Sequence, residues 1–255
     1  MNERKGDTNM ATTTNAALNQ QVIYELSLYN FSPEHDFDSV VRELDRIKDL
    51  GVDLIWLVPI HPRGEEMRLG EKGSPYSVKD YRGINPEHGD FASFARLVEE
   101  THKRGMKLLL DVVYNHTSRD SLLAKTHPEF FYHDQEGKPR CRFWQDVYDL
   151  DYANQALCDY MVETALFWAK LGVDGYRCDV APMVPLSFWR QAKAAMDQVN
   201  PDFIWLAETH HYPFLTRMRD QGWQLHADAE MYECFDVTYD YDVHYFYEDY
   251  LKGKG

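Results

Sequence analysis

The chain has 255 residues, of which 44% are hydrophobic and 14% aromatic. This apolar content is sufficient for the core of one large domain or two smaller ones, and it is too high for a generally disordered protein. Its formal net charge of −15 argues against a nucleic-acid partner, because binding to phosphates needs clustered Lys and Arg. No segment approaches about eighteen continuous apolar residues, so we expect no membrane span and no membrane partner.

The first twenty residues are polar, poor in aromatics and without an apolar stretch that resembles a signal peptide. We therefore expect residues 1–20 to form a disordered tail. The four cysteines include no Cys-x-x-Cys pair, which predicts free thiols in a reducing compartment and neither a zinc site nor a disulfide framework. Together these features predict a cytoplasmic protein that acts on neutral ligands.

From residue 21 onwards, short β-branched or aromatic runs alternate with segments of helical periodicity, as in repeated βα units. In residues 37–51, for example, Val40, Leu44 and Ile47 recur at helical spacing and Gly51 ends the segment. The predicted strands are 21–28, 53–59, 106–114, 173–180, 203–208 and a weaker sixth at 223–228, and the predicted helices are 37–51, 90–105, 154–172 and 185–200.

The spacing between strands locates an insertion. Asp179 and Glu208 are 29 residues apart, about one βα unit, whereas Asp111 and Asp179 are 68 apart. The excess falls in residues 117–150, a polar, aromatic-rich and irregular segment that we expect to form a small separate domain. The near-continuous apolar strands predict a buried parallel sheet, either an open doubly wound sheet or a closed (β/α) barrel. No G-x-G-x-x-G or P-loop follows any strand, which disfavours nucleotide binding.

Acidic residues stand at the ends of three predicted strands, namely Asp111, Asp179 and Glu208. Because ligands bind at the carboxyl ends of parallel strands, we expect these three side chains to meet in one pocket. Two carboxylates suit glycoside cleavage, in which one attacks the anomeric carbon and the other protonates the leaving oxygen. Each acid alone could simply cap the following helix, so the hypothesis rests on the joint pattern.

Arg177 lies two residues before Asp179 in a predicted strand, so both side chains point to the same face. A neighbouring cation lowers the pKa of a carboxyl group, and we expect Arg177 to keep Asp179 ionised as a nucleophile. Glu208 follows the apolar run 203–207, where burial is expected to raise its pKa toward that of a general acid. The pattern therefore predicts Asp179 as the nucleophile and Glu208 as the proton donor.

Several motifs in this order resemble the α-amylase family, glycoside hydrolase family thirteen, over residues 21 to about 250. The segments "DVVYNH" (111–116) and "GYRCD" (175–179) resemble two family signatures, and Glu208 in "LAETH" stands where the family has its acid/base glutamate. The resemblance implies an α/β protein of (β/α)8 TIM-barrel type, with a small domain B inserted after the third strand. The expected division is barrel domain A over 21–116 and 151–255, and domain B over 117–150.

The resemblance also implies roles for individual residues. Tyr76 would stack on the glucose at the cleavage site, and His116 would bond to its hydroxyls. Arg177 would orient the nucleophile, and Asp111 would support the network at the strand ends. His210 is a further candidate for binding substrate.

Calcium is implied at one position. Asn115 stands where many family members bind calcium through a side chain. Ala181 and Pro182, however, replace the Lys-His that follows the nucleophile in calcium-dependent members. We therefore expect that no cofactor is required, with Asn115 as the candidate ligand should calcium bind.

The family's third catalytic acid, in an Asn-His-Asp motif after the seventh strand, has no counterpart here. With about six βα units instead of eight, we expect an incomplete barrel, truncated before its seventh strand. The resemblance implies a retaining hydrolase or transglycosylase acting on α-glucosidic bonds of starch, glycogen or maltooligosaccharides. The alternative is an inert fragment or a non-catalytic carbohydrate-binding relative, and an unrelated barrel enzyme such as an aldolase is disfavoured because no Lys ends a predicted strand.

Overall fold

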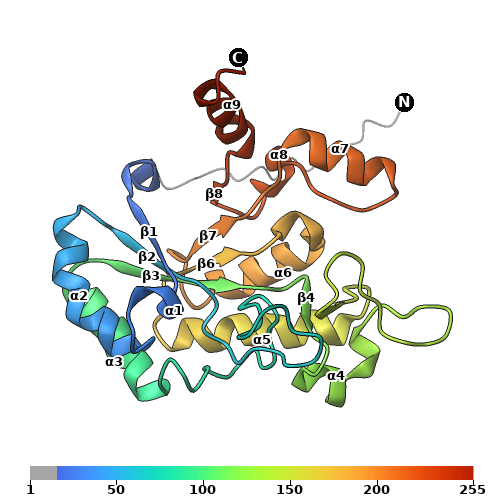
Figure 1. Ribbon diagram of the computed structural model, residues 1–255, viewed down its shortest axis with the longest axis horizontal. Coiled ribbons are helices and arrows are strands. Elements are labelled where there is room, and N and C mark those ends of the chain that lie inside the picture. The colour runs from blue at the N-terminus through green and yellow to red at the C-terminus, as the bar shows by residue number, and fades with distance from the viewer. Residues whose placement is uncertain (1–15, 255) are drawn as a thin grey trace.

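The computed structural model describes residues 16–254 and shows a six-stranded sheet in the order β1-β2-β3-β6-β7-β8, in which each neighbouring pair is parallel (Figure 1). The predicted incomplete (β/α)8 barrel is confirmed, because these strands follow the βα order of such a barrel and are fewer than eight. The strands are β1 (Ile23–Leu26), β2 (Leu54–Leu57), β3 (Lys107–Val112), β6 (Gly175–Cys178), β7 (Ile204–Ala207) and β8 (Val237–Thr238).

Three of the longer helices that connect the strands, α2, α3 and α5, begin at capping side chains. Asp36 accepts a hydrogen bond from the Ser39 amide at the start of α2, and Asp90 accepts one from the Ser93 amide at the start of α3. Helix α2 packs on α3 and helix α5 on α6 (Figure 1). The longer helices are α2 (Phe37–Asp49), α3 (Phe91–Lys103), α5 (Gln155–Lys170), α6 (Leu186–Asp197), α7 (Tyr212–Asp220) and α9 (Tyr241–Leu251), and the shorter ones are η1 (Ala16–Gln20), α1 (Leu28–Phe31), α4 (Leu122–Thr126), η2 (Pro128–Phe130), η3 (Ala181–Met183) and α8 (Asp228–Met231).

Successive residues of each strand point to opposite faces of the sheet. The outer face, which lies against the helices, contributes to a large apolar core that includes the buried rings of Trp168 and Trp189. The inner face carries a much smaller apolar cluster, and its polar residues lie toward the carboxyl ends of the strands. The apolar residues of this inner cluster are Leu54, Trp56, Leu109 and Ile204.

The expected domain B, residues 117–150, lies between β3 and α5. Strands β4 (His116–Ser118) and β5 (Val147–Asp149) pair in antiparallel fashion and hold the two ends of this segment together. The chain between them contains α4, η2 and a long irregular loop. This segment therefore leaves the sheet at the carboxyl end of β3, next to the strand ends that carry the predicted acids.

The predicted sixth strand at 223–228 is wrong, because the sixth strand of the sheet is β8. Residues 223–227 form a loop, and its backbone is held by isolated hydrogen bonds to neighbouring residues instead of by a strand ladder. The guanidinium of Arg219 donates to the Leu225 carbonyl oxygen (2.9 and 2.7 Å), and the His226 amide donates to the Pro182 carbonyl oxygen (3.0 Å). The buried apolar pattern of this segment thus reflects loop packing and not strand pairing.

At the N-terminus, the last part of the predicted tail is ordered. Residues Ala16–Gln20 form η1, and Leu18 packs against the inner cluster. Residues 1–15 of the predicted tail lie outside the described residues. Between residues 16 and 254, no helix is both long enough and apolar enough to cross a lipid bilayer.

Candidate active site

The register of the sheet brings the predicted acids together at the carboxyl ends of three strands. Asp111 in β3 lies opposite Arg177 in β6. Asp179 directly follows β6 and Glu208 directly follows β7, and the amide of each bonds to the adjacent strand. Three segments that are distant in sequence therefore deliver four charged side chains to one place.

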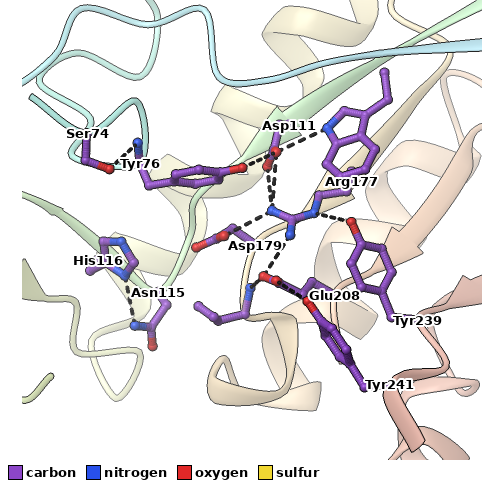
Figure 2. A network of polar contacts seen from close by, with 12 residues as sticks. Ser74, Tyr76, Asp111, Asn115, His116, Arg177, Asp179, Glu208, Tyr239 and Tyr241 are labelled. Carbon is purple, nitrogen blue, oxygen red and sulfur yellow. Dashed lines mark hydrogen bonds and ion pairs between the residues drawn. The ribbon is translucent and has the colours of Figure 1, made fainter. Parts of the chain in front are cut away.

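Arg177 is the centre of this cluster (Figure 2). Its Nη1 lies 3.0 Å from Asp111 Oδ1 and 3.0 Å from Asp179 Oδ1, and its Nη2 lies 2.8 Å from Glu208 Oε2. Its Nε donates to the hydroxyl of Tyr239 at 3.3 Å. The guanidinium is buried, so these contacts are formed away from bulk water and fix the orientation of all three carboxylates.

Asp111 is fully buried beneath the cluster and receives two further hydrogen bonds. Trp56 Nε1 donates to its Oδ2 at 3.1 Å. The Tyr76 hydroxyl donates to the same oxygen at 3.2 Å (Figure 2). Each acceptor oxygen of Asp111 therefore has a partner. Asp111 does not cap a helix; it joins Arg177 to a pocket tyrosine.

The electrostatics of Asp179 differ from the sequence-based expectation. Burial raises the pKa of Asp179 well above its ordinary value, the charge of Asp111 raises it further, and Arg177 lowers it without cancelling these effects. Burial also raises the pKa of Asp111 to about 7. The expectation that Arg177 holds the pKa of Asp179 low is wrong, because one guanidinium is shared by three carboxylates in a buried site.

Glu208 is held from two directions. The Val180 amide donates to its Oε2 at 3.0 Å, and the Tyr241 hydroxyl donates to its Oε1 at 3.4 Å. Val180 has a positive φ of 39°, a conformation that is costly for a β-branched residue. This local strain lies directly after Asp179, at the turn whose amide meets Glu208.

A pocket of about 320 Å³ opens above this network. It takes in the predicted residues Tyr76, His116, Asp179, Glu208 and His210, whereas Asp111 and Arg177 lie beneath its wall. The remaining lining residues are Leu69, Ser74, Ser77, Trp144, Asp146, Val147 and Val180.

The two pocket histidines have different surroundings. His116 is buried, its Nδ1 lies 3.1 Å from Asn115 Nδ2, and burial lowers its pKa to about 3, so the ring is neutral. Burial also lowers the pKa of His210, whose Nε2 has no hydrogen-bond partner among residues 16–254. Both rings can therefore offer neutral donors or acceptors to a ligand's hydroxyl groups.

The surroundings of Asn115 do not fit the implied calcium site. Its amide nitrogen faces His116, and the buried carboxylate of nearby Asp149 already pairs with Arg142, whose Nε lies 2.8 Å from Oδ2. In the described part of the chain, no group of three or more His, Cys, Asp or Glu side chains is placed to hold a metal. Calcium requires about six to eight oxygen ligands, so we assign no step to it.

The site also includes Trp56, Tyr239 and Tyr241, which were not predicted from the sequence. Trp56 has a signal that could have revealed it, because it shares the inner face of its strand with Leu54 and so points toward the inside of a barrel. Tyr239 and Tyr241 follow β8, and they were missed because the sixth strand was placed elsewhere. Their alternation in "TYDY" (238–241) is the available signal.

The Alpha-amylase family model, described as the alpha amylase catalytic domain, matches residues 7–141. This match covers just over half of the chain, and the chain belongs to this family of barrel-type catalytic domains.

Similar proteins agree with this assignment. Alpha-amylase MalA of Haloarcula japonica is 29% identical over 229 residues, covering 83% of this chain and 32% of that protein. The intracellular maltogenic amylase of Bacillus subtilis is 31% identical over 191 residues, covering 69% of this chain and 31% of that protein. The crystal structure of an alpha-amylase from Lactobacillus plantarum superposes with a TM-score of 0.90 at 48% identity, covering 92% of this chain and 56% of that chain. The chain thus spans about a third of the length of these curated relatives and about half of the solved structure.

Proposed function

We propose that the chain carries the nucleophile and the acid/base of a retaining glycoside hydrolase or transglycosylase that acts on α-glucosidic bonds of starch, glycogen or maltooligosaccharides. The observation that carries the proposal is the contact of Arg177 with three carboxylates, two of which line the pocket. Family membership supports the same chemistry. The relatives named above are amylases that span more sequence than this chain.

In the proposed reaction, Asp179 attacks the anomeric carbon and forms a glycosyl-enzyme ester while Glu208 protonates the departing oxygen. Glu208 then removes a proton from water or from an acceptor sugar, which releases the glycosyl group with its original configuration. Arg177 touches both carboxylates and fixes their relative orientation. Asp111 in turn holds Arg177 from below.

The charge of the cluster suits this reaction. When Asp111, Asp179 and Glu208 are all ionised, the single guanidinium leaves surplus negative charge in a site largely shielded from water. Because the transition state of glycoside cleavage is positively charged, this surplus stabilises it more than it stabilises the neutral sugar. The raised pKa of Asp179 belongs to the ligand-free site, and the developing positive charge favours its ionised form.

The remaining pocket residues supply sugar contacts in this proposal. Tyr76 offers its ring to the glucose at the cleavage point, while its hydroxyl stays bonded to Asp111. His116 and the unpartnered Nε2 of His210 would bond to hydroxyl groups. A neutral saccharide matches such a lining of rings and neutral hydrogen-bonding groups.

The test is covalent trapping of the full 255-residue chain. The protein is incubated with a fluorinated maltosyl fluoride, its intact mass is measured, and any adduct is located by peptide mapping. We expect one maltosyl group on Asp179, because fluorine slows hydrolysis of the ester more than it slows departure of fluoride. The Asp179→Asn variant should gain no mass.

The matched control is Asp146→Asn, which removes another acid from the same pocket. This variant should still be labelled on Asp179. Labelling at a different acid would disprove the nucleophile assignment. Folded protein that binds maltose without any adduct would instead favour a carbohydrate-binding function.

We also propose a cytoplasmic location. Three of the four cysteines are buried and all four are free thiols, which suits a reducing compartment. A relative whose name describes it as intracellular supports the same proposal. Detection of the protein in the cytosolic fraction of its source cells would test it.

A further inference from the structure

The guanidinium of Arg177 has two kinds of partner. Its two Nη groups contact three carboxylates, those of Asp111, Asp179 and Glu208. Its Nε donates instead to the hydroxyl of Tyr239 at 3.3 Å (Figure 2). Because a guanidinium is planar and its N–H groups point in fixed directions, the partner of Nε constrains where the two Nη groups can point.

The backbone of Tyr239 is fixed to the segment that carries Glu208. The Tyr239 amide donates to the Ala207 carbonyl oxygen at 3.2 Å, and its own carbonyl oxygen accepts from the Thr209 hydroxyl at 2.9 Å. Ala207 and Thr209 lie on either side of Glu208 in the sequence. The position of Tyr239, and through it that of the Arg177 Nε, is therefore tied to the proton donor of the proposed reaction.

The ring of Tyr239 is held on the inner face of the sheet. It packs against the small apolar cluster of that face, and its centroid lies 6.2 Å from that of Trp56, with the two rings edge to face. The central carbon of the Arg177 guanidinium lies 5.0 Å from the Trp56 centroid and 5.5 Å from the Tyr239 centroid. Both distances are within about 6 Å, the range in which an aromatic ring attracts a cation. The hydroxyl that meets Nε is thus carried on a ring that is itself packed in place.

The hydroxyl of Tyr239 is neutral at this position. Burial raises the pKa of Tyr239 well above its ordinary value, although Arg177 acts in the opposite direction. The hydroxyl therefore accepts from Nε without adding a fourth negative charge to the guanidinium. A carboxylate in its place would compete with Asp179 and Glu208 for the same cation, and an apolar group would leave Nε as a buried donor without a partner.

We propose that Tyr239 is a positioning residue, which by accepting from Nε orients the Arg177 guanidinium so that its Nη groups hold Asp179 and Glu208 in the geometry for glycosyl transfer. This role rests on the proposed function. Tyr239 does not line the pocket, so it acts through Arg177 and not on the saccharide. Without the hydroxyl, the guanidinium can turn and offer Nε to one of its carboxylates, which slows the attack by Asp179 but changes saccharide binding little.

The test is Tyr239→Phe, which keeps the ring and removes only the hydroxyl. The variant and the wild-type chain are labelled with increasing concentrations of the fluorinated maltosyl fluoride. This series separates the rate constant of labelling at saturation from the reagent concentration that gives half of that rate. Loss of one hydrogen bond to a charged group should lower the saturating rate by about tenfold. The half-saturating concentration should stay within about twofold of the wild-type value.

The matched control is Tyr232→Phe. The Tyr232 hydroxyl lies 2.9 Å from that of Thr238, the residue before Tyr239, and Tyr232 is 44% exposed. This variant loses a hydroxyl that contacts the same strand but not Arg177, and it should be labelled at the wild-type rate.

Three results would overturn the role of Tyr239 and leave labelling of Asp179, and with it the proposed function, intact. They are an unchanged saturating rate in Tyr239→Phe, slower labelling that arises only from weaker binding of the reagent, and equal slowing in Tyr232→Phe. A wild-type chain that gains no adduct would overturn the proposed function and the role of Tyr239 with it.

Discussion

The two faces of the central sheet are built from alternate residues of the same strands, yet their composition differs sharply. On the outer face, Leu110 and Tyr176 belong to a continuous apolar core between the sheet and its helices. On the inner face, Leu109 belongs to a cluster of only four buried apolar residues, and Asp111 and Arg177 form a buried ionic network. Strands β3 and β6 thus contribute to the apolar core with one set of side chains and to the candidate site with the other.

Because of this difference, the charged inner face carries a cost in folding free energy that the apolar outer face does not. Burying charged groups is expensive, and their mutual attraction offsets that cost only when each charge keeps its partners. The exposed pair of Lys138 and Glu136, by contrast, has side chains 72% and 74% exposed and contributes little in either direction. The ionic network is therefore best explained as a requirement of the proposed chemistry, and the apolar outer face offsets its cost in stability.

Replacing Arg177 with Met should have the largest effect on this balance. The substitution leaves Asp111, Asp179 and Glu208 without their shared cation, and removing one partner of a buried ion pair costs about 3–5 kcal/mol. We expect a loss of this size in the free energy of unfolding, measured by urea denaturation, together with loss of covalent labelling.

The double variant Arg177→Met, Asp111→Asn is the control. It removes the most deeply buried of the three carboxylates and should recover part of the lost stability without restoring labelling. If the Arg177→Met protein is as stable as the wild type, then the three carboxylates that contact Arg177 impose no electrostatic cost on the free energy of unfolding.

Two adjacent leucines of β3 allow the faces to be compared directly. Leu109 and Leu110 are both fully buried, the first on the inner face and the second on the outer. Each Leu→Ala change should lower the free energy of unfolding by about 2–5 kcal/mol, with the larger loss for Leu110→Ala because Leu110 lies in the larger apolar core.

Only Leu109→Ala should also weaken saccharide binding and labelling. Leu109 packs in the cluster that contains Trp56, whose indole donates to Asp111. Comparing maltose affinity of the two variants under conditions where both are folded tests this difference. Equal affinities would mean that the two faces are not functionally distinct.

Much of this arrangement could be predicted from the sequence because it depends on local patterns. Helical spacing and capping residues such as Asp36 define α2, and strand alternation places Arg177 and Asp179 toward one face. Parallel strands share their carboxyl edge, which is sufficient to predict that Asp111 and Glu208 approach the same site.

The last strand of the sheet and the electrostatics of the site could not be predicted, because they depend on contacts that no local pattern specifies. Residues 223–228 alternate like a strand, but Leu225 and His226 are buried by packing of a loop. The two-residue strand β8 is too short to give a recognisable signal. The pKa of Asp179 depends on how many carboxylates share Arg177, and that number follows from the three-dimensional register and not from sequence spacing.

The pH dependence of the free energy of unfolding provides a test, with a smaller expected effect, of whether the outer face excludes charge. His61 is buried on this side of the sheet, with its ring 5.3 Å from that of Trp168. Burial lowers its pKa from 6.5 to about 4, although the Gly83 carbonyl and the charge of Asp80 act in the opposite direction. Between these two pH values the unfolded chain binds a proton at His61 that the folded protein does not bind, so stability falls as the pH is lowered.

His61→Asn removes this dependence while retaining an amide that can donate to Gly83 from the position of Nδ1. The cavity left by the smaller side chain costs the same at every pH, so the variant should be less stable at pH 7 but should lose less on acidification. At about 1.36 kcal/mol per pH unit, the difference between the two unfolding curves should shrink by about 3 kcal/mol from pH 6.5 to pH 4. Parallel curves over this range would mean that His61 is protonated in the folded protein, and the outer face would then tolerate a buried charge as the inner face does.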